Sequence, residues 1–198
     1  MNRTFLALAF LLAPITSIAQ NNQDFLFGED ALGLIHNVHL SVNDRVTGGC
    51  WTNIESIKQK TRLTLEQSGI SVYLEPLSTT FPLAANISIE AFGDRTSYST
   101  CYGSLSISVV SSANRNFRGV TLIAEGRYFH RNYVAIGNSL NEQFSEASET
   151  AINELSATII SKRRNELVKE LITLYGEILT ATPETMSEMF ERLDLERN

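Results

Sequence analysis

Two hydrophobic periods divide the chain. Between residues 35 and 130, apolar side chains recur at every second position in several short runs, which is the period of a half-buried β-strand. From Leu140 onward they recur every third or fourth position, which is the period of an amphipathic helix. The pattern therefore predicts a sheet followed by a helical C-terminal part.

Five runs predict strands. They cover residues 35–42, 70–74, 87–91, 101–109 and 120–124, the last extending towards His130. In the fourth run the alternation is clearest, and its polar members are expected to face water: Tyr102, Ser104, Ser106 and Ser108. The short connections between the last three runs favour antiparallel pairing.

One helix is expected among these strands. Thr52 and Glu55 have the spacing of a capping box, Ile57 and Leu65 lie on one helical face, and Gly69 stands where a left-handed C-cap belongs. Strand, helix and strand follow one another closely, which predicts a crossover unit with two parallel strands.

The C-terminal third carries two apolar stripes. One contains Phe144, Ala151 and Ile159, and the other runs from Leu167 to Ile178 on a different side of the helix. A single straight helix cannot place both stripes on one sheet, so we expect a break at 162–165, where basic residues suit a helix C-terminus. The alternative is an unbroken helix that projects towards another chain. Thr182-Pro183 then predicts a short final helix.

The predicted fold is α+β. We expect a mostly antiparallel sheet of about five strands in the order β-α-β-β-β-β-α, helices on one face, and a helical C-terminal extension. The predicted divisions are a signal peptide over 1–19, a disulfide-stapled α+β domain over 20–164 and the extension over 165–198.

The N-terminus has the secretory pattern. Arg3 precedes an unbroken apolar run of nine residues from Phe5 to Ala13, and Ser17 and Ala19 are the small residues of a cleavage site before Gln20. The run is too short to span a bilayer. We therefore expect an exported protein, periplasmic or secreted, with no membrane span in the mature chain.

Export determines how the two cysteines are interpreted. In an oxidising compartment Cys50 and Cys101 predict a structural disulfide, since no C-x-x-C motif or nearby histidine favours a redox or metal site. Trp51 is expected to pack near it.

Charge excludes one class of partner. The chain has 22 acidic and 16 basic residues, a net charge of −6, and removal of Arg3 with the leader leaves 15 basic residues and −7. Nucleic acid binding needs a basic surface, so we expect no nucleic acid partner.

No pattern of residues points to catalysis. His36 and His39 lie on opposite faces of a strand, and His130 has no carboxylate within four positions. Nucleophile-elbow, S-x-x-K, phosphate-loop and calcium-loop motifs are missing, so we assign no catalytic residue, no metal site and no cofactor.

One segment has an unusual composition. Between residues 115 and 133 the chain carries four arginines and four aromatic residues against a single acid, Glu125. Arginine beside aromatic rings can bind anions or stack on sugars. The candidate ligand-binding residues are Arg115, Arg118, Arg127, Arg131 and Tyr128. The alternative is a solvated hairpin in which Arg127 and Arg131 pair with Glu125.

These features favour a non-catalytic exported binding or envelope-assembly module. The alternative is a small exported hydrolase whose site is assembled in space around His130 or His39. Expected partners are another envelope protein, or a second copy contacted through the C-terminal helices.

Overall fold

The structure is a computed structural model, and it describes residues 29–77, 85–117, 120–182 and 185, with the backbone alone at 112–117, 120–125 and 178. The elements are a 3-10 helix η1 (Asp30–Leu34), β1 (Asn37–Val46), α1 (Ile54–Gln67), β2 (Ser71–Tyr73), β3 (Ala85–Arg95), β4 (Cys101–Phe117), β5 (Val120–Gly137), α2 (Asn141–Lys162) and α3 (Glu166–Leu179). The predicted signal peptide and nearly all of the predicted final helix lie outside the described residues.

The α+β class and a sheet of five strands are confirmed. The strands lie in the order β2-β1-β3-β4-β5. The two longest ladders, β4–β5 and β3–β4, are antiparallel as predicted, and β1 and β2 form the predicted parallel pair. However, β3 also pairs parallel to β1, which makes the sheet mixed. Alternation reveals which face a residue occupies but not which strand lies beside it, so this pairing could not be predicted.

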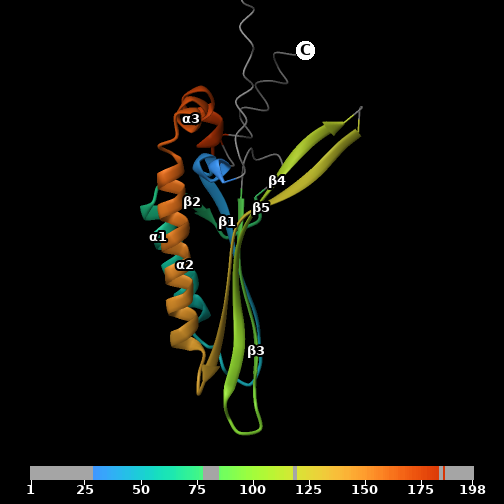
Figure 1. Cartoon of the computed structure of the whole chain (residues 1–198), viewed down its shortest axis with the longest axis vertical. Helices are drawn as coiled ribbons and strands as arrows, with labels where there is room; N and C mark the ends of the chain where they lie inside the picture. Colours follow the sequence, from blue (N-terminus) through green and yellow to red (C-terminus); the bar gives the residue numbers. More distant parts are fainter. Residues whose placement is uncertain (1–28, 78–84, 118–119, 183–184, 186–198) are drawn as a thin grey trace, which may run out of the picture.

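Helices cover one face of the sheet (Figure 1). Over residues 38–40 of β1, 85–91 of β3 and 101–111 of β4, every second side chain points towards the helix layer and is buried, as with Leu40, Ile89 and Ile107. Phe144 and Leu155 of α2 fill the same core from the helix layer. The opposite face of the sheet has no helix over it in the described part of the chain (Figure 1).

The start of α1 differs from the predicted capping box. Asn53 is the N-cap, without a side-chain capping bond. Thr52 instead pairs with Asn141 at the start of α2: its N–H donates to Oδ1 at 2.8 Å and its hydroxyl accepts from Nδ2 at 2.9 Å. This exchange ties the two helix starts together. Gly69 has φ +73°, the predicted left-handed cap.

The predicted break between α2 and α3 is confirmed. Lys162 ends α2 and donates to Asp30 at 2.9 Å, while Arg163 donates to the carbonyl oxygens of Ile35 at 2.9 Å and Ser68 at 3.2 Å. Asn165 then caps α3 through the N–H of Leu167 at 2.9 Å. The basic residues thus bind the 3-10 helix and the end of α1, as well as standing at a helix C-terminus.

Beyond the break, α3 packs on η1. Val168 and Leu179 form a small second core with Leu34. Leu171 and Ile172 are partly buried against this core. Leu174 and Tyr175 are exposed, at 65% and 51%.

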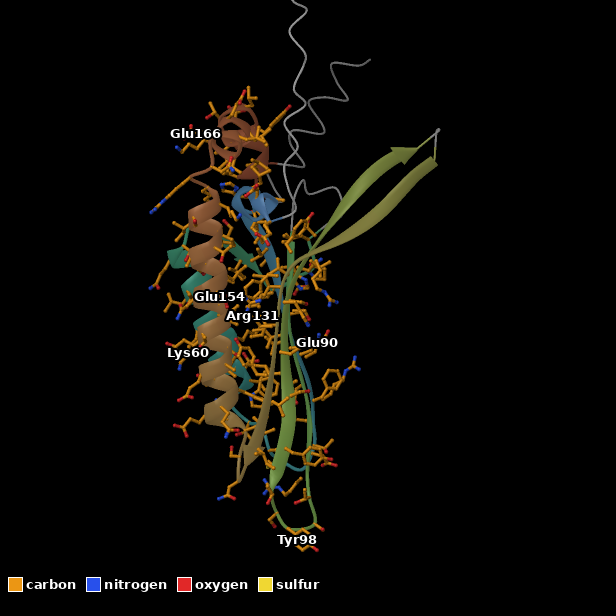
Figure 2. The ribbon with its side chains drawn as sticks, in the orientation of Figure 1. Lys60, Glu90, Tyr98, Arg131, Glu154 and Glu166 are labelled. Carbon is orange, nitrogen blue, oxygen red and sulfur yellow. A yellow bond between two sulfur atoms is a disulfide. The ribbon has the colours of Figure 1, made fainter. Side chains whose placement is uncertain are left out.

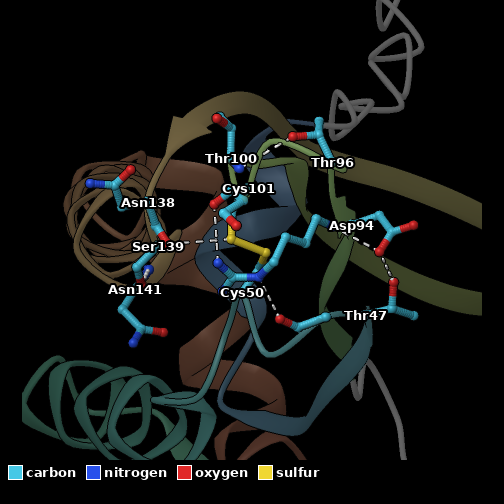
Figure 3. Close-up of a disulfide and its surroundings, with 12 residues drawn as sticks. Thr47, Cys50, Asp94, Thr96, Thr100, Cys101, Asn138, Ser139 and Asn141 are labelled. Atoms are coloured by element: carbon cyan, nitrogen blue, oxygen red, sulfur yellow. Dashed lines mark hydrogen bonds between the residues drawn. A yellow bond between two sulfur atoms is a disulfide. The ribbon is translucent and has the colours of Figure 1, made fainter.

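Cys50 and Cys101 form the predicted disulfide, with an S–S distance of 1.96 Å and Cα atoms 5.6 Å apart (Figure 3). Both cysteines are fully buried, and Trp51 beside them is buried too, its ring meeting that of Phe144 edge-on at 5.6 Å. The bridge joins the loop before α1 to the first residue of β4.

The β4–β5 hairpin is longer than the rest of the sheet. Ser111 is the last β4 residue that pairs with β3, yet the β4–β5 ladder continues through Phe117 and Val120. Residues 112–117 and 120–125 therefore form a two-stranded arm that leaves the body of the molecule on the side away from the helices (Figure 1). No helix within the described ranges is long and apolar enough to cross a membrane.

Candidate functional site

The uncovered face of the sheet is built from cross-strand rows of polar side chains. Strand alternation sends every second residue of β1, β3, β4 and β5 to this face, and the register aligns them in rows. The rows are Ser41-Ser88-Ser108-His130, Asn43-Glu90-Ser106-Asn132 and Arg45-Phe92-Ser104-Val134. The predicted water-facing residues of β4, from Tyr102 to Ser108, all lie here. The first two rows consist mainly of hydroxyl and amide side chains.

One end of this face is apolar instead. Four large side chains are exposed together: Phe92 is 41%, Tyr102 48%, Ile136 68% and Val134 89% exposed. They line a shallow depression of about 480 Å³ on β3, β4 and β5. We call these four residues the apolar patch. Exposed apolar surface gathered in one place marks interaction sites on folded proteins.

The sheet beneath the patch is held close to the helix layer by glycine. A Cβ on Gly103 would lie 2.6 Å from the Phe92 carbonyl oxygen and 2.8 Å from Leu140 Cδ1. No side chain fits at this position without a shift of the neighbouring backbone, so glycine lets the strands under the patch lie directly against Leu140.

Loops tied together by hydrogen bonds border the patch, since Asp94 pairs with Tyr102 in register. Figure 3 shows the bond between Asp94 and Thr47. Arg95 donates to the carbonyl oxygens of Gly48 at 2.8 Å and Ser99 at 3.1 Å. Asp94 accepts the hydroxyl of Thr47 and the N–H of Arg95, and these bonds lower the pKa of the Asp94 carboxyl. These contacts fix the β3–β4 turn.

An aromatic side chain lies in the β3–β4 turn. Tyr98 is almost fully exposed and points away from the body of the molecule (Figure 2). Beside the patch, the guanidinium of Arg45 lies over the ring of Phe92, 5.2 Å from its centroid. Rigid aromatic rings among serine and asparagine are the composition that paratopes use to contact proteins.

Glu90 is the acidic side chain at the middle of the uncovered face (Figure 2). Its Oε1 accepts the Ser88 hydroxyl at 3.2 Å, and its cross-strand neighbours are Asn43 and Ser106. Hydrolysis by paired carboxylates needs a second acid opposite the first. The neighbouring row positions hold amides and hydroxyls.

The histidines bond to amide and carbonyl groups. His39 Nδ1 lies 3.1 Å from Asn86 Oδ1, and His130 Nε2 accepts from Asn132 at 2.9 Å. His36 Nδ1 contacts the carbonyl oxygen of Leu34 at 3.0 Å. Across the described residues, no group of three histidine, cysteine or acidic side chains could hold a metal ion.

The arginine–aromatic candidates have separate positions. Arg131 pairs through two nitrogens with Glu154 of α2, one at 2.9 Å, and lies 4.7 Å over the ring of Phe129 (Figure 2). The hydrogen bonds from Arg131 lower the pKa of the Glu154 carboxyl. Glu154, rather than the Glu125 considered from the sequence, is therefore the partner of Arg131. Tyr128 is half-buried against the main core.

The other candidates lie on or near the arm. Arg127 is exposed at the base of the arm. The backbone of Arg115 pairs in register with that of Leu122. The side chain of Arg115 and the whole of Arg118 lie outside the described part of the chain. The structure thus places Arg131 and Tyr128 against the helix layer and the core. The prediction of ligand binding therefore rests on the remaining candidates, Arg115, Arg118 and Arg127.

The apolar patch was missed by reasoning from the sequence. A signal for it exists: residues 133–136 read Tyr-Val-Ala-Ile, so β5 is apolar at both odd and even positions there. A strand with one face in water is expected to alternate. A lapse of alternation indicates a second apolar face.

Comparisons with known proteins give no family. No protein-family profile matches the chain, and no curated protein matches it. A solved structure titled "Crystal structure of uncharacterized protein" aligns over 69% of this chain and 93% of that chain at 10% identity, with a TM-score of 0.27. A score this low assigns no shared fold family.

Proposed function

We propose that the protein is an exported, non-catalytic binding module whose contact surface is the uncovered face of the sheet. The observation that carries the proposal is the apolar patch, in which Val134 and Ile136 are more than two-thirds exposed beside Tyr102. Leaving such surface in water is unfavourable, by roughly 25 cal/mol for each Å². A partner that covers the patch recovers this free energy.

The buried disulfide supports export. Structural disulfides persist in periplasmic and extracellular compartments and are rare in the reducing cytosol. Cys50 and Cys101 are both fully buried, so the bridge has a structural place in the core. This is compatible with the leader predicted over residues 1–19.

The contacts of the histidines support binding over hydrolysis. A general base needs a partner that orients it and a nucleophile within reach. His39 and His130 instead share hydrogen bonds with Asn86 and Asn132 on the sheet face.

Photo-crosslinking in the cells that make the protein tests this proposal. The full chain carries a photoreactive phenylalanine analogue at Tyr102 in the patch, at Arg127 at the base of the arm, or at Leu63 on α1. Leu63 is the matched control, because it is apolar and 56% exposed but lies in the helix layer. We expect adducts with another envelope component at Tyr102 and none at Leu63.

The outcome at each position has one meaning. Adducts at Arg127 as well would add the arm to the contact surface. Equal adducts at Tyr102 and Leu63, or none at Tyr102, would contradict the proposal. An adduct with the mass of two chains reports self-association and does not count for it.

A further inference from the structure

The two edges of the sheet are protected very differently. Natural proteins block edge strands by making them short, or with charges, prolines and bulges. At one edge β2 spans only Ser71–Tyr73. At the other, β5 is long, and over Asn132–Gly137 it has no charged residue and no proline, while the one irregularity of the β4–β5 register lies elsewhere, at Val109 and Val110.

The hydrogen bonds show which β5 groups point outward. The N–H of Thr96 donates to the carbonyl of Thr100 at 2.8 Å. The backbone N–H and C=O groups of even-numbered β4 residues therefore point towards β3, and those of odd-numbered β4 residues point towards β5. Tyr102 pairs with Ile136 in register, which directs the even-numbered residues of β5 to the free side.

Two side chains cover part of this free side. Gln143 donates to the carbonyl oxygen of Ile136 at 3.2 Å, and Arg131 donates to that of His130 at 2.9 Å. Between these two points, the outward N–H and C=O groups of Asn132 and Val134 have no partner within the described part of the chain. They form an open pairing site.

This open site adjoins the apolar patch. Val134 and Ile136 belong to both, since their backbone lies on the edge and their side chains lie on the uncovered face. A strand added at this edge would thus satisfy the outward groups and cover apolar side chains in one step.

The edge complements itself. In an antiparallel two-fold pairing centred on Val134, Asn132 lies opposite Ile136 of the second copy, and Tyr133 lies opposite Ala135 of the second copy, a large residue against a small one. In this register, residues whose backbone N–H and C=O groups point to the free side lie opposite residues of the same kind in the second copy. An antiparallel ladder needs this arrangement to form its hydrogen bonds.

Charge at this edge does not oppose a second copy locally. Each chain carries a net charge of −6, which repels a second copy overall. Residues 132–137 carry no charge, so the contact itself brings no like charges together. The nearest charged residue, Arg131, is neutralised by Glu154 of its own chain and would lie opposite Gly137 of the second copy.

We propose that β5 of one chain pairs with β5 of a second copy through Asn132–Gly137, and that the protein is a two-fold dimer with one continuous sheet. The two apolar patches then adjoin on one face of this sheet, and the two arms point in opposite directions. The proposal is independent of the envelope partner proposed above, because a dimer can form with or without one.

Light scattering of the full mature chain across micromolar concentrations tests the dimer. We expect the mass of two chains, falling to that of one in Val134→Lys, which places a like charge of each copy at the centre of the pairing. Leu63→Lys is the matched control and keeps the dimer. Because Val134 is 89% exposed, circular dichroism should show an unchanged fold in the variant.

A covalent test fixes the register. On mild oxidation Val134→Cys should give a disulfide-linked dimer, since residue 134 meets its own copy, whereas Leu63→Cys should not. A monomeric wild type would overturn the proposal, as would a dimer that survives Val134→Lys. A dimer lost only in Leu174→Ser would also overturn it and assign self-association to α3. The photo-crosslinking result at Tyr102 stands apart from all three.

Discussion

His36 and Arg163 lie close together where β1 begins and α2 ends. Both are half-buried, and the guanidinium of Arg163 bonds to the carbonyl oxygen of Ile35, the residue before His36. Burial lowers the pKa of His36 below its ordinary value of 6.5, and the charge of Arg163 lowers it further, against the hydrogen bond to Leu34 that raises it. The folded protein therefore favours the neutral imidazole more strongly than the unfolded chain does.

Stability should consequently fall as the pH falls below 6.5. In the unfolded chain His36 takes up a proton at its ordinary pKa, whereas in the folded chain it does so only at lower pH, so acid favours unfolding between the two values. The slope from this group cannot exceed about 1.4 kcal/mol for each pH unit. Urea unfolding at several pH values should show a smaller slope in His36→Asn, whose amide can still donate to Leu34. Equal slopes would contradict this assignment.

At the scale of elements, η1 depends on a glycine. Gly33 sits against the turn between α2 and α3, where an added Cβ would lie 2.9 Å from the backbone carbon of Lys162 and 2.9 Å from Val168 Cγ1. Neither neighbour can move freely, because one belongs to the backbone and the other is fully buried. The absence of a side chain thus lets the 3-10 helix reach the junction.

Gly33→Ala should destabilise the protein by about 1–3 kcal/mol, the usual cost of overpacking. Gly176→Ala in α3 is the matched control, since its Cβ would meet nothing within 4 Å, and it should stabilise by about 0.5–1 kcal/mol because alanine favours a helix. Thermal or urea unfolding measures both changes. A neutral Gly33→Ala would show that the junction adapts.

Elements were predictable where the sequence repeats a period or carries its own cap. The strand runs, the left-handed Gly69 and the break after Lys162 follow from local pattern. Pairings across long separations do not: Arg131 and Glu154 are 23 residues apart, and only the packing of α2 on β5 brings them together. Thr52 likewise bonds Asn141 instead of completing a local cap.

At the scale of the whole molecule, separate contacts hold its two ends. The disulfide and the Trp51–Phe144 pair lie at the end where β4 begins, and the α3–η1 core lies at the other end (Figure 1). The bridge closes a loop of 51 residues that contains α1, β2 and β3. Its loss should therefore loosen the molecule unevenly.

The double variant Cys50→Ala/Cys101→Ala tests this. The chain-entropy relation gives about 4 kcal/mol for a loop of this length, which for a domain of this size corresponds to a fall of about 10 °C in Tm. Hydrogen exchange should quicken first around residues 47–53 and 96–101, beside the former bridge, and only later in α3, whose contacts with Leu34 and Asn37 do not involve the cysteines. Wild type treated with reductant is the control, because it should acquire the same Tm and the same exchange pattern without any change of sequence. If hydrogen exchange became faster by the same factor along the whole chain, the two ends would unfold as one unit.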